Sequence, residues 1–389
     1  MMGHFLVVPL LALCCATAGG DSAAAVPEPR AATALERAVD GVLAASFGDR
    51  GFSGVVLVEK EGRPLLRKAY GLADRTVGSP NTPETRFMIM SVSKQFTAAL
   101  VLRLAARGRL DLRDRVGDFL DDWPMEWEAV TIHDLLSHSS GTDIDTTAFW
   151  LFLHHPEYWP HPAEAPPRYE PRALVTPPGT VFRYSNVGYT LLTMIAAAAG
   201  GMPFDELMRD EVFCPLGMER TEPERRGPVA GRARGYRHTE DGFELWEQRT
   251  VDIVGAGDLV STVDDLAKWD EALWDDRFLP APLRAAMFTS HVAAKTAGIG
   301  YGYGWFLRTG DDGRPLQWHA GGGAGFRAWN FRLPEARLAV VVLSNVVIED
   351  SSGWVFELLA RIETATAETK RVPNEVEIPV ARSRDRIWG

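Results

Sequence analysis

The sequence predicts an α+β fold in which an antiparallel sheet, built from both ends of the chain, is flanked by helices and interrupted by a mostly helical region. Strand-like segments occur in two groups, near residues 53–70 and 303–343. Between them, Ser91–Met287 is largely helical. Two helices in this region, Ser91–Arg107 and Val187–Ala199, are apolar on nearly every side, so we expect both to be buried.

The N-terminal part of the sheet follows a helix. Ala31–Ala45 has helical spacing and stops at Ser46-Phe47-Gly48. Ser53–Lys60 and Pro64–Tyr70 then read as two strands, joined by the turn residues Glu61-Gly62-Arg63. This pattern predicts a β-hairpin.

The C-terminal part of the sheet is expected to add four strands and a closing helix, Gly353–Ile362. The strands are Tyr303–Arg308, Leu316–His319, Arg327–Arg332 and Leu338–Leu343. We therefore predict a discontinuous sheet domain over 31–80 and 295–364, a helical region over 81–294 and a C-terminal tail over 365–389. Within the helical region, Trp150–Pro178 has no clear period and predicts a long loop.

Composition limits the function. The chain has 389 residues, of which 46% are hydrophobic, enough for one large domain or two that pack closely. Its 41 basic and 52 acidic residues give a formal net charge of -11, which repels nucleic acid and anionic lipid. We expect a small molecule as the partner.

The N-terminus resembles an export signal. Phe5–Ala18 is a short apolar run ending in Ala16-Thr17-Ala18, which predicts a signal peptide over 1–18 and a periplasmic or secreted protein. Cys14 and Cys15 leave a lipid anchor open, and the lack of Lys or Arg before the run leaves a cytoplasmic start open. The run is too short for a stable membrane span. Cleavage would leave Cys214 as the sole thiol.

Ser91 and Lys94 are the first chemical candidates. Residues three apart on a helix share a face, so the Ser91 hydroxyl and the Lys94 ammonium can touch. Burial lowers the pKa of a lysine towards a form that takes a proton from serine, and a helix N-terminus offers N–H groups to an oxyanion. Taken alone, the pair fits a helix cap with a surface lysine at least as well.

Two later segments add to that pair. Tyr184-Ser185-Asn186 precedes the second apolar helix and offers a phenol and a carboxamide, although an aromatic residue before an Asn cap explains it too. His319-Ala320-Gly321-Gly322-Gly323 ends a strand with glycines that admit a substrate backbone. The alternative there is a glycine-rich loop beside a structural histidine.

SVSK, YSN and HAG, in this order and with a helical insertion between the first and last, resemble the three motifs of the penicillin-recognising serine hydrolases. That family comprises class C β-lactamases, D-Ala-D-Ala carboxypeptidases, D-aminopeptidases and family VIII esterases. Other stretches also resemble it: Phe87–Thr97, Ile132–Gly141, Pro178–Asn186, Phe213–Met218, Gly257–Trp269 and Ala339–Asn345.

The resemblance implies a role for each motif. Ser91 would attack a carbonyl and become acylated, and Lys94 and Tyr184 would share the general-base task. Asn186 would hold Lys94 and the substrate amide. The backbone N–H groups of Ser91 and Gly322 would form the oxyanion hole. No metal or organic cofactor is implied.

The sequence departs from the family pattern at two positions. His319 replaces the lysine with which the third motif of β-lactamases usually begins, and it is charged only near or below about pH 6.5 unless its surroundings intervene. Strong β-lactamase activity is therefore not expected. Met90 replaces the glycine common before the nucleophile. Gly321 would border the substrate, and Arg327 would bind a carboxylate in place of the lysine or act as an ordinary sheet-edge arginine.

Two further groups of residues are open to interpretation. Trp150 and Trp159 would roof the pocket or hold the long loop down. His138 is expected to brace the active-site loop, and the other histidines lack the ligand pattern of a metal site.

The hypothesis is an exported serine hydrolase that cleaves an ester or a D-amino-acid peptide. A penicillin sensor without turnover, an inactive binding protein and a class C-like β-lactamase remain alternatives.

Overall fold

The computed structural model describes residues 32–48, 51–143, 147–148, 151, 154–155, 173–224, 229–246, 253–310, 312–347 and 353–368. Residues from Ala34 onward form one compact unit, apart from Met1–Thr33. The predicted signal peptide, Trp150, Trp159 and the chain beyond residue 368 lie outside the described residues. The domain boundaries proposed from the sequence stay predictions.

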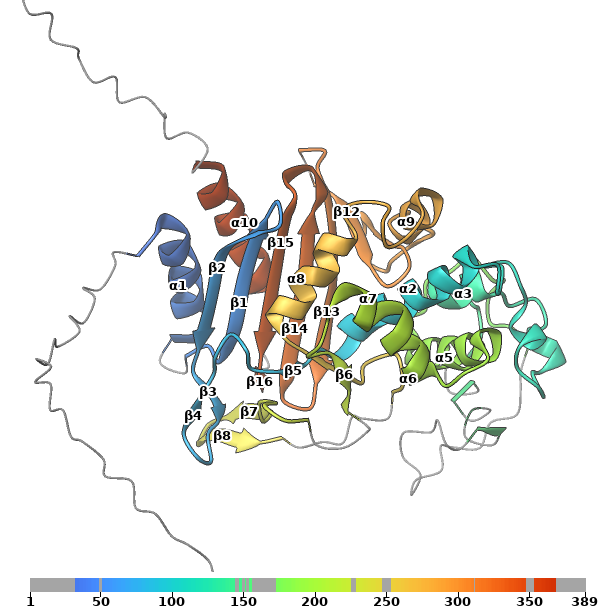
Figure 1. The fold of residues 1–389 in the computed structure, drawn as a ribbon, viewed down its shortest axis with the longest axis horizontal. Coiled ribbons are helices and arrows are strands. Elements are labelled where there is room, and N and C mark those ends of the chain that lie inside the picture. The colour runs from blue at the N-terminus through green and yellow to red at the C-terminus, as the bar shows by residue number, and fades with distance from the viewer. Residues whose placement is uncertain are drawn as a thin grey trace, which may run out of the picture. The chain divides into compact units, whose positions relative to one another are not determined.

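The described residues form two groups of strands near the chain ends, with most of the helices between them (Figure 1). The α-helices are α1 (Ala34–Phe47), α2 (Ser93–Ala106), α3 (Ile132–Leu136), α5 (Asn186–Gly200), α6 (Phe204–Met208), α7 (Cys214–Leu216), α8 (Val263–Ala272), α9 (Ala281–Met287) and α10 (Gly353–Glu368). The strands are β1 (Gly54–Lys60), β2 (Arg63–Tyr70), β3 (Leu72–Asp74), β4 (Ser79–Pro80), β5 (Phe87–Met88), β6 (Glu222–Pro223), β7 (Tyr236–Thr239), β8 (Gly242–Leu245), β9 (Leu259–Ser261), β10 (Val292–Ala293), β11 (Ile299–Tyr301), β12 (Phe306–Thr309), β13 (Pro315–Gly323), β14 (Phe326–Leu333), β15 (Leu338–Ser344) and β16 (Val346–Val347).

The main sheet joins the two ends of the chain. Its eight strands lie in the order β10-β11-β12-β13-β14-β15-β1-β2, and every neighbouring pair is antiparallel. The N-terminal hairpin enters through β1, which pairs with β15 from Gly54↔Ser344 to Lys60↔Leu338. The predicted fold class is confirmed.

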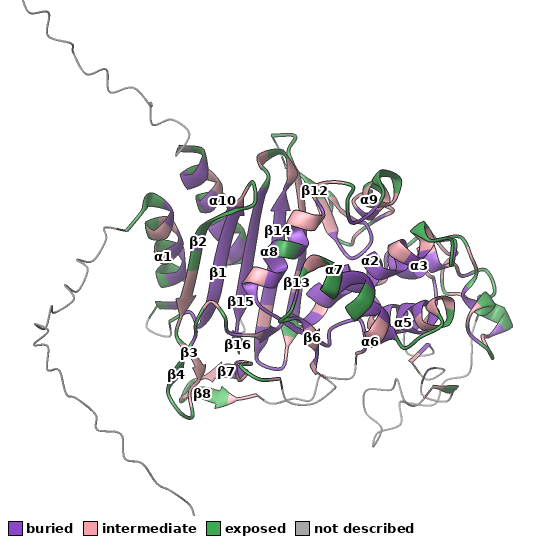
Figure 2. Ribbon diagram, in the orientation of Figure 1, coloured by how far each residue is buried: buried purple, intermediate pink, exposed green. Residues whose placement is uncertain are grey.

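Each face of the sheet is covered by a different set of helices. Side chains alternate along a strand, so Val55 and Leu57 pack into the core shared with α2, α5 and α8, whereas Val56 and Val58 pack against α1 and α10. Figure 2 shows these central strands buried between the two layers. Ser91 and Lys94 belong to the α2 side.

Several element boundaries differ from the prediction. The strand expected from Tyr303 begins only at Phe306, because Gly304 takes a φ of +79° and passes so close to α2 that a Cβ would lie 2.9 Å from the Lys94 carbonyl oxygen. β13 continues through the glycines to Gly323. α10 extends to Glu368, so the predicted tail begins inside a helix.

No single helix among the described residues is long and apolar enough to cross a membrane. One bent pair, Asn186–Gly200 with Phe204–Leu216, meets the length and composition criteria across a break of 82°. Most of α5 is buried within the protein core.

Candidate active site

The turn before α2 presents Ser91 at the start of the helix. Met90 has a φ of +49°, a backbone conformation that is uncommon for a residue with a side chain, and Met90–Val92 forms a short 3-10 helix that leads into α2. This left-handed conformation gives a physical reason for the glycine that the family resemblance leads one to expect there. Gly321 packs directly on the turn, since a Cβ would overlap the Ile89 carbonyl oxygen.

Lys94 is fully buried and hydrogen-bonds three oxygens. Its Nζ lies 3.2 Å from Ser91 Oγ, 2.8 Å from Asn186 Oδ1 and 2.7 Å from the Ala256 carbonyl oxygen. An ammonium has three N–H donors and no acceptor, so the charged form uses all three here. The neutral amine would keep two of these bonds and turn its lone pair towards the Ser91 hydroxyl.

Burial favours this neutral form. It lowers the pKa of Lys94 well below its usual value, and the nearby Asp258 carboxylate opposes the shift only partly. The three contact atoms are neutral oxygens, which stabilise the ammonium less than a carboxylate would. The position of Lys94 and its lowered pKa therefore make it able to accept a proton from Ser91.

Tyr184 and Asn186 approach Lys94 from the start of α5. Ser185 caps this helix, its Oγ accepting a hydrogen bond of 3.0 Å from the Gly188 N–H. Lys94 Nζ lies 4.7 Å from the centre of the Tyr184 ring. Burial raises the pKa of Tyr184 above its usual range, and a hydrogen bond with Ser91 acts in the opposite direction. Tyr184 is therefore a neutral phenol at pH 7 in the free protein.

His319 is buried and uncharged. Burial and, to a lesser extent, the charge of Lys94 together lower its pKa to about 3, although a hydrogen bond to the Ala320 carbonyl acts the other way. Because a carbonyl only accepts, Nδ1 donates to Ala320 O at 2.7 Å, and Nε2 is left to accept from the Tyr301 hydroxyl at 3.2 Å. The surroundings thus keep His319 neutral near pH 7, where it cannot replace the charge of a lysine.

His138 braces the loop that carries Tyr184, as the sequence predicted. Its Nδ1 accepts a hydrogen bond of 3.2 Å from the Ser185 N–H, and its carbonyl oxygen accepts one of 2.7 Å from the Arg183 N–H. Its ring lies 4.4 Å from that of Tyr184, measured between centres. Sequence reasoning missed Tyr301, which comes from a strand too short to predict.

Gly322 and Arg327 face each other across β13 and β14. Ala328 belongs to the core on the Ser91 side and Trp329 to the core on the α10 side, so Arg327 points away from Ser91. A Cβ on Gly322 would overlap Arg327 Nη1. The roles of these two residues stay predictions, as do those of Trp150 and Trp159.

A cavity of about 440 Å³ adjoins Tyr184. Its wall is formed by two short segments and one strand residue: Val181–Tyr184, Ala294–Thr296 and Phe306. Arg183 and Lys295 were not singled out from the sequence, because neither belongs to a motif. Only the fold brings them beside Tyr184.

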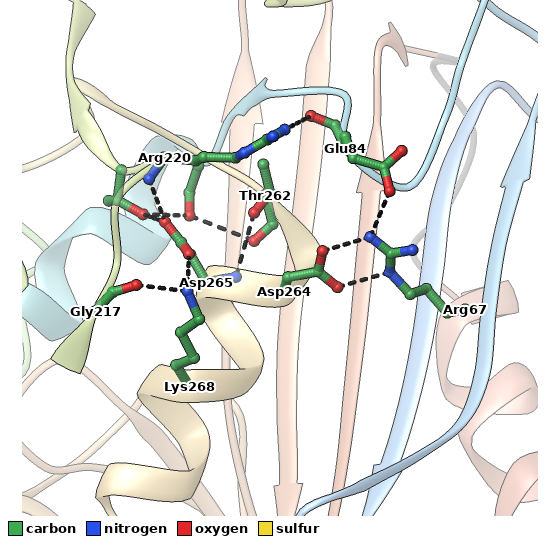
Figure 3. A network of polar contacts seen from close by, with 10 residues as sticks. Arg67, Glu84, Gly217, Arg220, Thr262, Asp264, Asp265 and Lys268 are labelled. Atoms are coloured by element: carbon green, nitrogen blue, oxygen red, sulfur yellow. Dashed lines mark hydrogen bonds and ion pairs between the residues drawn. The ribbon is translucent and has the colours of Figure 1, made fainter.

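A larger cavity, about 660 Å³, lies elsewhere, between α8 and the β1–β2 hairpin. Its wall includes Arg67, Asp264 and Lys268, which belong to the polar network that fixes the N-terminus of α8 (Figure 3). None of the candidate catalytic residues lines it. Across the described ranges, no group of three or more His, Cys, Asp or Glu is placed to hold a metal ion.

This sheet and helix arrangement, with serine, lysine and tyrosine meeting beside a glycine-rich strand, is that of the β-lactamase and penicillin-binding fold. The family model described as Beta-lactamase matches residues 10–355, so the chain belongs to that family.

Its relatives differ in activity. The chain is 29% identical over 318 residues to penicillin-binding protein 4* of Bacillus subtilis, covering 76% of this chain and 68% of the relative. It is 30% identical over 308 residues to a D-aminopeptidase of Brucella anthropi, covering 76% of this chain but only 56% of the relative. A D-amino acid amidase from Ochrobactrum anthropi SV3 matches with a TM-score of 0.70 and 25% identity, over 86% of this chain and 99% of the amidase.

Proposed function

We propose that this chain is a serine hydrolase that cleaves an ester or amide bond through an acyl-Ser91 intermediate. The observation that carries the proposal is Lys94, a buried lysine of lowered pKa that lies 3.2 Å from Ser91 Oγ. An acyl hydrolase requires such a base, because a serine hydroxyl is a weak nucleophile at its own pKa.

Residues of this chain can carry out each step of acylation and deacylation. Lys94 takes the Ser91 proton as Oγ adds to the substrate carbonyl. The backbone N–H groups of Ser91 and Gly322 stabilise the oxyanion. The neutral Tyr184 phenol, hydrogen-bonded to Ser91, passes a proton to the leaving group. Water then cleaves the acyl ester by the reverse proton path and releases an acid.

Substrate choice is supported by His319 and by the relatives. A neutral His319 lacks the charge that the lysine of β-lactamases supplies, which favours ester and peptide substrates over β-lactams. The D-aminopeptidase and the D-amino acid amidase act on amide-type bonds by name. The test below also distinguishes this hydrolase from a penicillin sensor and from a true β-lactamase.

The test compares wild type with Ser91→Ala. Both are incubated with a fluorophosphonate and a fluorescent penicillin, and turnover is measured on a p-nitrophenyl ester and a D-Ala-D-Ala peptide. We expect fluorophosphonate labelling and turnover in wild type only. Labelling that survives Ser91→Ala would falsify the nucleophile assignment. Penicillin labelling without any turnover would replace the hydrolase by a sensor, and fast penicillin turnover would replace it by a β-lactamase.

We also propose export through a signal peptide at residues 1–18, on the strength of the apolar run ending in Ala16-Thr17-Ala18. The measurement is the N-terminal sequence of the protein recovered after expression with the full chain. A start at Gly19 supports the proposal. A lipidated Cys14 or Cys15, or an uncleaved chain in the cytoplasm, contradicts it.

A further inference from the structure

The cavity beside Tyr184 is lined by two cations, the partly buried Arg183 and the exposed Lys295. Arg183 and Lys295 both line it, and neither side chain forms an ion pair or hydrogen bond with any residue that the structure describes. The Arg183 Nε is also buried from solvent. A buried donor without a partner is costly, so its presence points to a ligand group.

Backbone hydrogen bonds connect the segments that carry Arg183 and Lys295 to elements of the proposed active site. His138 binds the backbone on either side of Tyr184, through the Arg183 and Ser185 N–H groups. Lys295 lies in the turn between β10 and β11, which is closed by a hydrogen bond of 2.8 Å from the Ala294 N–H to the Ile299 carbonyl. β11 in turn carries Tyr301, which binds His319.

The remaining wall of the cavity is mostly apolar. Val181, Phe182, Ala294 and Phe306 supply it, and Thr296 adds a hydroxyl. Among the residues that the structure describes, no Asp or Glu lines the cavity. Charge pairs are stronger beside apolar walls than in open water, so this site favours an anion with an apolar neighbour.

We propose that Arg183 and Lys295 bind a carboxylate on the leaving group of the substrate. This inference rests on the proposed function, since Tyr184 delivers the leaving-group proton and the cavity begins at Tyr184. The proposed anion site thus lies in the loop before α5 and the β10–β11 turn, and not on β13 at His319. The preferred substrates are thus acyl compounds whose departing half ends in a carboxylate.

The test uses two phenylacetyl thioesters that share one acyl group. One releases mercaptoacetate and the other the neutral mercaptoacetamide. We expect wild type to favour the mercaptoacetate ester in kcat/KM by about tenfold or more, as a charge-assisted hydrogen bond predicts. Arg183→Gln and Lys295→Gln should each lower that preference several-fold, and Lys295→Glu should lower it further.

Arg308→Gln is the matched control, because it removes an exposed arginine of β12 that does not line the cavity. Its preference should equal that of wild type. An equal preference in wild type and in all cavity variants would overturn the proposal. Lys295 is exposed, so its variants stay informative if Arg183→Gln does not fold.

Binding to Ser91→Ala separates this proposal from the proposed function. Calorimetry with the two thioesters reads affinity without chemistry, and we expect tighter binding of the mercaptoacetate ester, lost in Ser91→Ala/Lys295→Gln. Selective binding without turnover in wild type would contradict only the hydrolase. Turnover without selectivity would contradict only the carboxylate site.

Discussion

The cations around α8 and those around Ser91 are held in opposite ways. Beside α8, Arg67 Nε lies 2.7 Å from Asp264 Oδ1, and Lys268 Nζ lies 2.9 Å from Asp265 Oδ1 (Figure 3). At the catalytic centre, Lys94 contacts only neutral oxygens, and Arg183 and Lys295 have no side-chain partner among the described residues.

The paired cations beside α8 stabilise the fold, whereas we infer that the cations without a carboxylate partner near Ser91 serve binding or proton transfer. A surface pair such as Arg67–Asp264 adds little free energy but fixes where α8 begins. A buried cation without a carboxylate lowers stability, and a folded protein keeps one where it serves binding or proton transfer. Four changes test this contrast, in order of decreasing effect.

Replacing Lys94 by methionine should have the largest effect. It keeps the length of the side chain and removes the proton acceptor, so kcat on an ester should fall about a thousand-fold or more. Stability should change little, because the unfavourable burial of the amine is lost together with its hydrogen bonds to Asn186 and Ala256. Lys268→Met is the control and should keep wild-type kcat. Residual activity above about a tenth of wild type would mean that another group takes the Ser91 proton.

Gly321→Ala and Gly322→Ala should differ sharply. The Cβ at Gly321 meets backbone, the Ile89 carbonyl oxygen, whereas the Cβ at Gly322 meets only the end of the Arg327 side chain, which can move. We expect Gly321→Ala to cost about 1–3 kcal/mol of unfolding free energy and about tenfold in kcat. Gly322→Ala should cost less on both measures. Equal losses in denaturant melts and rate assays would contradict the close packing of β13 on the nucleophile turn.

His319 should make stability depend on pH. Its pKa is about 3 in the folded protein and 6.5 in an unfolded chain, so between these values the unfolded state binds the extra proton. The free energy of unfolding should therefore fall as the pH drops below about 6.5, by up to about 1.4 kcal/mol per pH unit. His138 is shifted in the same direction and adds to the slope.

Denaturant titrations from pH 8 to pH 5 measure this slope, and His319→Gln should reduce it. An NMR titration that finds His319 protonated near pH 6.5 would contradict a buried neutral ring. It would also restore His319 as a candidate for binding anions.

Arg67→Gln should have the smallest effect. Its guanidinium is one-third exposed and its partners Asp264 and Glu84 are more exposed still, so the loss should stay within about 1 kcal/mol. The kcat on an ester should not change. A large loss of activity in the same assay would show that the α8 network is coupled to the catalytic centre.

The proposed catalytic residues were more predictable than their neighbours. Ser91 and Lys94 lie three residues apart at a helix start, so their spacing indicates that they can touch, whereas Tyr184 and Asn186 joined them only through the family resemblance. Arg183 and Lys295 lie 112 positions apart in the sequence (295 − 183), so no local spacing relates them. Only the fold, through the β10–β11 turn, brings them to the same cavity.

The protonation state of His319 could not be predicted from the sequence either. The sequence around a histidine does not show how far its pKa is shifted. The surroundings of His319 include Tyr301, Phe306 and Lys94, which come from three other elements. The sheet was predictable because its longer strands are apolar runs rich in β-branched residues and bounded by turn residues, whereas β10 and β11 are too short to give such a signal.

The strand β13 carries a risk that has nothing to do with catalysis. β12 pairs with it only at Pro315–Trp318, and beyond that point β14 is the one described strand that pairs with it, so the edge at Gly321–Gly323 stays open to a substrate backbone. An open edge also invites strands of other molecules and so promotes aggregation. Three consecutive glycines are poor strand formers and offer no side chains to a pairing partner. The glycines that we propose border the substrate thus also disfavour pairing of this edge with a strand of another molecule.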